Sequence, residues 1–242
     1  MIFSYDYGHG TGQDRGAKGI LDEEKEIRRY APYCINMLMR AGHTCVNCTP
    51  ENENLSLMDS LSYRVNKANA SNSQLHLCFH VNAFNGTAQG SEIEVASDAG
   101  AKYGLSILNE ICKLGFNNRG IKRPDLYITK HTNMTACLIE PFFCDNKTDC
   151  GIYEPQKLGE AIAKGVLNIS KGNYTPPDIK TPPENNDIPQ QGDNITLLNG
   201  GGWIERVKDG RTILHQSRTV YLSLTKDGHL DFTNLNGNKR IV

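Results

Sequence analysis

The first 172 residues alternate between strand-like and helix-like segments, and this alternation constrains the fold more than any other feature. Apolar or alternating runs predict strands over 2–7, 44–48, 75–81, 91–97 and 136–143. Helical periodicity predicts helices over 24–42, 56–70, 100–115 and 155–170. Strands and helices that take turns along a chain form a sheet covered by helices. The sequence therefore predicts an α/β fold, a twisted and mostly parallel sheet with helices on both faces.

The rest of the chain has a different character. Five of the ten prolines fall in the stretch TPPDIKTPPENNDIP, whose polar composition predicts an extended linker over 173–194. Two patterns of strand, Asp-Gly turn and strand follow, over 203–216 and 219–234, and predict β-hairpins. We therefore expect three segments: a domain over 1–172, the linker, and a small all-β module over 195–242.

Composition narrows the classes of function. The formal net charge of -1 says little about partners, and no apolar run is long enough to cross a membrane. We expect neither nucleic acid nor a membrane as a partner. The N-terminus lacks a secretory signal pattern, which predicts a protein that is first kept in the cytosol. Most of the eight cysteines lie in apolar runs, so we expect reduced, buried thiols.

Three chemistry-bearing residues follow or end predicted strands. His9 follows the first strand in the glycine-rich loop of SYDYGHGTGQDRGAKG, His80 ends LHLCFH, and Glu140 ends ACLIE. Functional groups gather at the carboxyl ends of such strands. Two imidazoles and a carboxylate are the ligand set of a catalytic zinc, and a further carboxylate can take a proton from the attacking water. Each residue alone is a weak signal, so the hypothesis depends on the combination.

The order of motifs along the chain makes the hypothesis of a zinc site more specific. The chain resembles the zinc-dependent N-acetylmuramoyl-L-alanine amidases of the third amidase family, found in bacterial autolysins and phage endolysins. The resemblance rests on Asp6-Tyr7-Gly8-His9-Gly10, Asp14-Arg15-Gly16-Ala17-Lys18-Gly19, Arg64 with Ala68-Asn69, His80-Val81-Asn82-Ala83, Gly90-Ser91-Glu92, Arg119-Gly120 and Leu138-Ile139-Glu140-Pro141-Phe142-Phe143. These motifs span nearly all of residues 1–172.

The resemblance implies that His9 and His80 bind Zn²⁺, that Glu140 is the catalytic glutamate and that Asn82 contacts substrate. The third zinc ligand is Glu23 or Glu24. The family often has Glu followed by Lys, which favours Glu24. Helical spacing instead places Glu23 on the apolar stripe and Glu24 on the surface face, so we predict Glu23.

The implied function is hydrolysis of the amide between N-acetylmuramic acid and L-alanine in peptidoglycan. We expect an endolysin of a Gram-positive host, made in the host cytoplasm and acting on the cell wall after the membrane is breached. The C-terminal module, with 7 basic and 4 acidic residues, would bind an anionic or carbohydrate wall polymer, with Trp203 either stacking on sugar or serving as a core residue. The alternative is a catalytically inactive wall-binding protein on the same fold.

Overall fold

The computed structural model describes residues 1–51 and 54–170 in full, and the backbone of six strands between 194 and 241. The chain divides into two compact units, Met1–Thr175 and Pro176–Val242. The predicted linker over 173–194 falls, apart from Asn194, outside the described residues, so the division into three segments stays a prediction. None of the described helices is long and apolar enough to cross a membrane.

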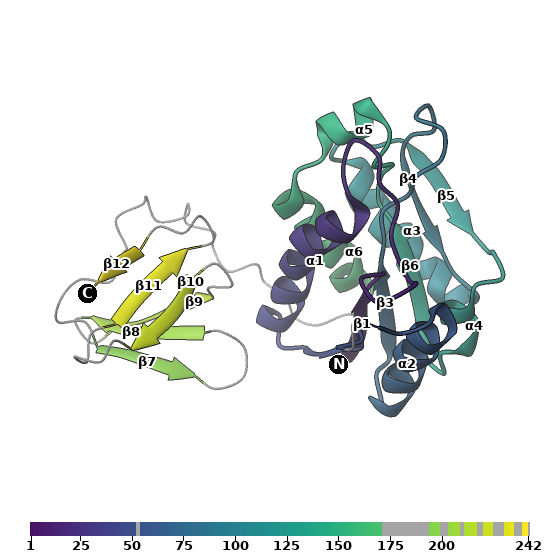
Figure 1. Ribbon diagram of the computed structural model, residues 1–242. Helices are drawn as coiled ribbons and strands as arrows, with labels where there is room; N and C mark the ends of the chain where they lie inside the picture. The colour runs from purple at the N-terminus through teal and green to yellow at the C-terminus, as the bar shows by residue number, and fades with distance from the viewer. Residues whose placement is uncertain are drawn as a thin grey trace. The chain divides into compact units, whose positions relative to one another are not determined.

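A six-stranded sheet organises the first unit (Figure 1). Its strands are β1 (Ile2–Tyr7), β2 (Thr44–Asn47), β3 (Leu75–Phe79), β4 (Ser91–Glu94), β5 (Asn118–Lys122) and β6 (Thr135–Glu140), in the order β2-β1-β3-β6-β4-β5. The first four strands of that order are parallel, whereas β4 is antiparallel to β6 and parallel to β5. The predicted mostly parallel sheet is confirmed, with a reversed pair at one edge.

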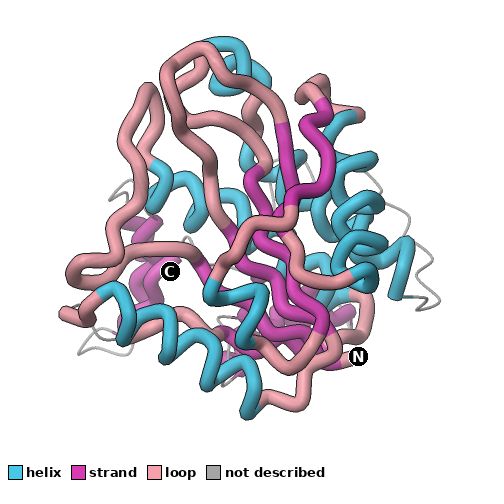
Figure 2. The backbone as a smooth tube through the Cα atoms, turned by 90° about the vertical axis from the view of Figure 1, so that its right-hand side faces the viewer, coloured by secondary structure: helices cyan, strands magenta, loops and turns pink. Residues whose placement is uncertain are grey.

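Helices cover both faces of this sheet. The helices α1 (Glu23–Arg40), α3 (Asp98–Cys112) and α6 (Pro155–Ser170) pack together on one face, and α2 (Leu57–Ala70) and α4 (Tyr127–His131) pack on the other. A short helix, α5 (Lys147–Ile152), follows β6. Figure 1 shows the two helical layers on opposite sides of the sheet, and Figure 2 turns the second layer toward the viewer. The α/β fold is therefore confirmed.

The helix α1 shows how the sequence pattern produces this packing. Its N-cap Asp22 accepts a hydrogen bond from the N–H of Lys25, which satisfies one of the unpaired donors of the first turn. The apolar stripe of α1 is buried, as periodicity predicted; it consists of Ile27, Tyr30, Ala31, Cys34 and Leu38. The stripe fixes the rotation of the helix about its axis and thereby the direction of its first residue, Glu23.

The second unit contains two three-stranded antiparallel sheets. One holds β7 (Asn194–Leu198), β8 (Trp203–Lys208) and β9 (Arg211–Gln216), and the other holds β10 (Val220–Leu224), β11 (Leu230–Asn234) and β12 (Lys239–Ile241). Lys208 of β8 lies opposite Arg211 of β9. The turn predicted at Asp209-Gly210 lies outside the described residues and stays a prediction. The side chain of Trp203 lies outside the described part of the chain, and its predicted sugar contact stays a prediction.

Candidate metal centre

His9, Glu23 and His80 converge at the carboxyl end of the sheet. His9 lies in the loop after β1, Glu23 begins α1, and His80 directly follows β3. One nitrogen or oxygen of each residue lies within 4.8 Å of the others. The Oε1 atom of Glu23 is 3.2 Å from Nε2 of His9 and 3.1 Å from Nδ1 of His80. Two imidazole nitrogens and one carboxylate oxygen, aimed at a common point, form a donor set that fits a metal ion with an open position.

The structure separates the two candidate glutamates. Glu23 is buried, and its Oε2 accepts the N–H of Ala17 at 2.7 Å, which leaves Oε1 directed at the imidazoles. Burial alone would raise the pKa of Glu23, but the hydrogen bonds and charges of His80 and His9 outweigh burial and hold it well below its usual range. The carboxylate of Glu24 instead pairs with Arg15 at 2.7 Å and accepts the N–H of Gly16. Of the two, only Glu23 contacts the histidines.

Arg28 lies four residues after Glu24 on α1, a spacing at which the two side chains can form an ion pair. The guanidinium instead donates to the carbonyls of Gly8, His9 and Glu24, at 3.0 to 3.2 Å. The carboxylate of Glu24 is occupied by Arg15, so Arg28 is free to tie the beginning of α1 to the loop that carries His9.

The glycines around His9 allow the loop to pack closely against the ring of His80. A Cβ atom on Gly8 would lie 2.6 Å from both Cε1 and Nε2 of the His80 ring. His9 itself has a φ of 58° and Gly10 a φ of 91°, a left-handed path that costs a residue with a side chain about 1 kcal/mol or more. The bare loop thus places the two imidazoles edge to face, with ring centroids 4.6 Å apart.

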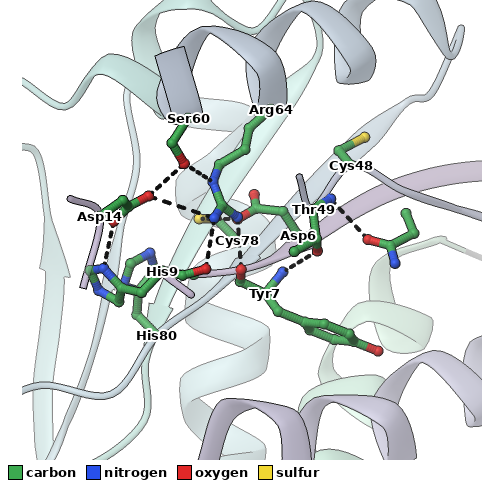
Figure 3. A network of polar contacts seen from close by, with 12 residues as sticks. Asp6, Tyr7, His9, Asp14, Cys48, Thr49, Ser60, Arg64, Cys78 and His80 are labelled. Carbon is green, nitrogen blue, oxygen red and sulfur yellow. Dashed lines mark hydrogen bonds and ion pairs between the residues drawn. The ribbon is translucent and has the colours of Figure 1, made fainter. Parts of the chain in front are cut away.

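Asp14 sets the orientation of the His9 ring (Figure 3). Oδ1 of Asp14 lies 2.7 Å from Nδ1 of His9, and Oδ2 accepts the hydroxyl of Ser60 at 2.6 Å. Burial lowers the pKa of His9, but the hydrogen bonds and charges of Asp14 and Glu23 outweigh burial and raise the pKa to about 9. A carboxylate on Nδ1 leaves Nε2 as the ring nitrogen that faces the site.

A buried arginine fixes the end of β1 and the loop that carries His9. Arg64, on α2, is 1 % exposed and donates to Oδ1 of Asp6 at 2.5 Å and to the carbonyls of Tyr7 and His9 at 2.7 and 3.0 Å. Asp6 also contacts His76 at 2.9 Å. Burial would raise the pKa of Asp6, but the charges of Arg64 and His76 hold it well below its usual range. Asp14 and Arg64 both lie in the sequence motifs, but neither was predicted to support the site.

Glu140 ends β6 beside the metal centre. Its Oε2 atom is buried and has no hydrogen-bond partner among the described residues. Burial raises the pKa of Glu140 well above its usual range, and the negative charges of Glu23, Glu94 and Glu92 add to the effect. A carboxyl group with high proton affinity, one oxygen of which is buried without a partner, suits an acid or base in a reaction.

Asn82, the predicted substrate contact, already has partners within the protein. Its Nδ2 donates to Oε1 of Glu92 at 2.8 Å, and its Oδ1 accepts the N–H of Ala83 at 2.9 Å. The side chain therefore joins the chain after His80 to β4. Contact with substrate stays a prediction.

A pocket of about 190 Å³ opens beside His9 and His80 on the side of α2 and α4. Its floor contains Asp6, Cys78 and Leu138, which are consecutive cross-strand partners on β1, β3 and β6. Its apolar walls consist of Leu57, Leu61, Leu126, Tyr127 and Ile128. The metal centre thus adjoins a pocket that can admit part of a ligand.

Comparisons with known proteins agree with this geometry. The family model for N-acetylmuramoyl-L-alanine amidase matches residues 5–169. The chain is 28% identical over 182 residues to the endolysin of Bacillus phage SPP1, a match covering 69% of this chain and 66% of that protein. It is 30% identical over 174 residues to the N-acetylmuramoyl-L-alanine amidase LytC of Bacillus subtilis, a match covering 67% of this chain and 34% of LytC.

A solved structure, the catalytic domain of the CD27L endolysin targeting Clostridia Difficile, has the same fold. It superimposes with a TM-score of 0.63 at 30% identity, covering 69% of this chain and 96% of that domain. The chain spans less than two thirds of the length of the SPP1 endolysin and of LytC. The residues that the family model matches lie in the first unit. The chain belongs to the N-acetylmuramoyl-L-alanine amidase family.

Proposed function

We propose that this chain is a zinc-dependent peptidoglycan hydrolase that cleaves the amide between N-acetylmuramic acid and L-alanine. The observation that carries the proposal is the convergence of His9, Glu23 and His80 beside Glu140, whose buried Oε2 has no hydrogen-bond partner among the described residues. Family membership supplies the substrate class.

Nε2 of His9, Oε1 of Glu23 and Nδ1 of His80 are the atoms that would hold the zinc ion. When bound, the ion supplies positive charge that polarises the scissile carbonyl and acidifies an attacking water. Glu140 takes a proton from the water while the oxygen of that water attacks the carbonyl carbon. It then gives that proton to the L-alanine nitrogen, the carbon–nitrogen bond breaks, and a carboxylic acid and a free amine are released.

The surrounding network keeps these groups in place. Asp14 holds the Nδ1 side of His9, so the ring presents Nε2. Arg64 bonds the carbonyl of His9 and balances the charge of Asp6. Because each position is fixed before substrate arrives, little reorganisation is needed during the reaction.

We further propose an endolysin role. Similarity to the SPP1 endolysin and to the catalytic domain of the CD27L endolysin supports it. In this proposal the protein is made in the cytoplasm of a Gram-positive host and reaches the wall after the membrane is breached. The second unit, whose segment 195–242 carries 7 basic and 4 acidic residues, would hold an anionic or carbohydrate wall polymer.

Digestion of purified Gram-positive peptidoglycan tests the proposal. New N-terminal alanine without new reducing sugars, abolished by a chelator and restored by zinc, is the expected result. New reducing sugars would instead indicate a glycosidase and overturn the assignment. Neither product, with the protein still sedimenting with the walls, would indicate the alternative, a wall-binding protein that has lost catalysis.

A further inference from the structure

Arg119 occupies an irregular position at the edge of the sheet. In the pairing of β4 with β5, Ser91 lies opposite Asn118 and Glu92 lies opposite Gly120, so Arg119 is the extra residue of a bulge. Gly120 has a φ of 85°, and its N–H donates to the side chain of Asn118 at 2.8 Å. Bulges redirect side chains and are frequent beside active sites. The backbone is thus built to turn the side chain of Arg119 out of the regular pattern.

Two contacts fix the guanidinium while leaving one edge free. Nε of Arg119 donates to Oε2 of Glu92 at 2.8 Å, and the guanidinium lies over the ring of Phe143, 4.8 Å from its centroid. Nη1 reaches only the carbonyl of Gln89, at 3.5 Å, and Nη2 has no hydrogen-bond partner within residues 1–51 and 54–170. The side chain is 35% exposed. A planar fork held at Nε, with Nη1 only weakly bonded and Nη2 unpaired among the described residues, is suited to a carboxylate ligand.

Glu92 connects this arginine to the reaction centre. Glu92 is the cross-strand partner of Glu140, which places their Cα atoms about 4.5–5.5 Å apart. The other oxygen of Glu92 accepts the side chain of Asn82, two residues after His80. Only one carboxylate therefore separates Arg119 from the proposed catalytic glutamate.

We propose that Arg119 binds the α-carboxylate of the residue that follows L-alanine in the substrate, a role that rests on the proposed function. N-acetylmuramic acid has one carboxyl group, and the scissile amide consumes it, so an anion near this bond lies on the peptide side. An extended peptide advances about 3.3–3.6 Å per residue, so the residue after L-alanine lies within a few ångströms of the scissile bond. Arg119 therefore selects substrate by charge.

Two synthetic substrates test this role. They are N-acetylmuramoyl dipeptides that carry a carboxylate or a carboxamide at the α-position after L-alanine and are otherwise identical. The wild-type chain is expected to favour the carboxylate by about 10- to 100-fold in kcat/KM, the range of a charge-assisted hydrogen bond. Arg119→Gln is expected to bring that ratio close to 1, mainly through KM, and Arg119→Lys to restore part of it. Arg123→Gln is the matched control, because Arg123 lies just beyond β5 and pairs with Asp98, and it should keep the wild-type ratio.

The outcomes separate this role from the proposed function. Equal cleavage of both substrates by the wild type, or an equal loss for both in Arg119→Gln, would overturn the role of Arg119 and leave the amidase assignment standing. If the wild type cleaves neither substrate, the assignment fails, and binding of the same compounds to Glu140→Gln decides the role of Arg119. Tighter binding of the carboxylate, lost when Arg119→Gln is added, would support it; equal binding would overturn it.

Discussion

Oδ1 of Asp14 lies 2.7 Å from Nδ1 of His9, and this bond decides which nitrogen of the ring faces Glu23. The aspartate is itself fixed by the hydroxyl of Ser60 at 2.6 Å. A metal ligand with such a partner keeps its tautomer and its orientation.

Removing that partner should weaken the metal site. We expect Asp14→Ala to lower zinc affinity by about 10- to 100-fold, the usual effect of losing a group that orients a ligand. Competition titration against a zinc chelator measures this effect. Asp98→Ala, which removes a carboxylate on α3 that is 98% exposed, is the control and should bind zinc as the wild type does. Unchanged affinity in Asp14→Ala would mean that Nε2 of His9 is presented without it.

Glu140 and His80 should fail in different ways. Glu140→Gln is expected to keep zinc and to lose about 100- to 10,000-fold in turnover, since it removes a general base without removing a ligand. His80→Ala should lose both the metal and the activity. Metal analysis of the purified variants, together with release of N-terminal alanine, separates the two roles. Activity in Glu140→Gln within a few-fold of the wild type would contradict our assignment.

Steric contact predicts the effect of Gly8→Ala. The added Cβ would lie 2.6 Å from the ring of His80, so the ring or the loop must move, and zinc affinity should fall by at least about 10-fold. Gly151→Ala is the matched control, because a Cβ there meets nothing within 4 Å. If both variants bind zinc like the wild type, the loop after β1 is more adaptable than its packing indicates.

The ion pair of Asp6 and Arg64 should make the stability of the fold depend on acidic pH. The pKa of Asp6 is lowered from 3.8 in the folded protein, so its carboxylate contributes stability above pH 3.8 that is lost as the pH falls toward the folded value. Asp6→Asn leaves Arg64 buried without its charge partner and should cost about 3–5 kcal/mol at pH 7.

Denaturant unfolding at a series of pH values checks this prediction. The difference in unfolding free energy between the wild type and Asp6→Asn should narrow below pH 3.8. Asp98→Asn should remain within about 0.5 kcal/mol of the wild type at neutral pH, because its pair with Arg123 is exposed. A difference that does not change with pH would show that the carboxylate charge is not the source of the stability.

The regular elements of the first unit could be predicted because their apolar residues follow a period. Glu23 could also be placed, since the buried stripe of α1 fixes the direction of its first turn. Three described elements of the first unit were missed: β5, α4 and α5. The α4 and α5 helices have five and six residues, too few for a helical period to show.

The strand β5 was missed for another reason. Its sequence, NRGIK, contains a glycine with positive φ and a bulge residue, so apolar and polar positions do not alternate. The polar network was hidden as well. Asp6 and Arg64 are 58 positions apart, and only the pairing of β1 with its neighbours and the packing of α2 bring them together. An ion pair between residues that far apart in the sequence produces no short-range sequence pattern from which it could be predicted.

The reversal of β4 has a consequence for how this protein can change over evolutionary time. The proposed zinc ligands and Glu140 come from β1, α1, β3 and β6, whereas Glu92 and Arg119 come from the reversed edge pair β4 and β5. Of the two, β5 is the outermost strand and pairs only with β4, so a substitution of the partly exposed Arg119 disturbs few other side chains. If Arg119 contacts substrate as proposed, substrate preference can change at this edge while the residues of the metal centre stay the same.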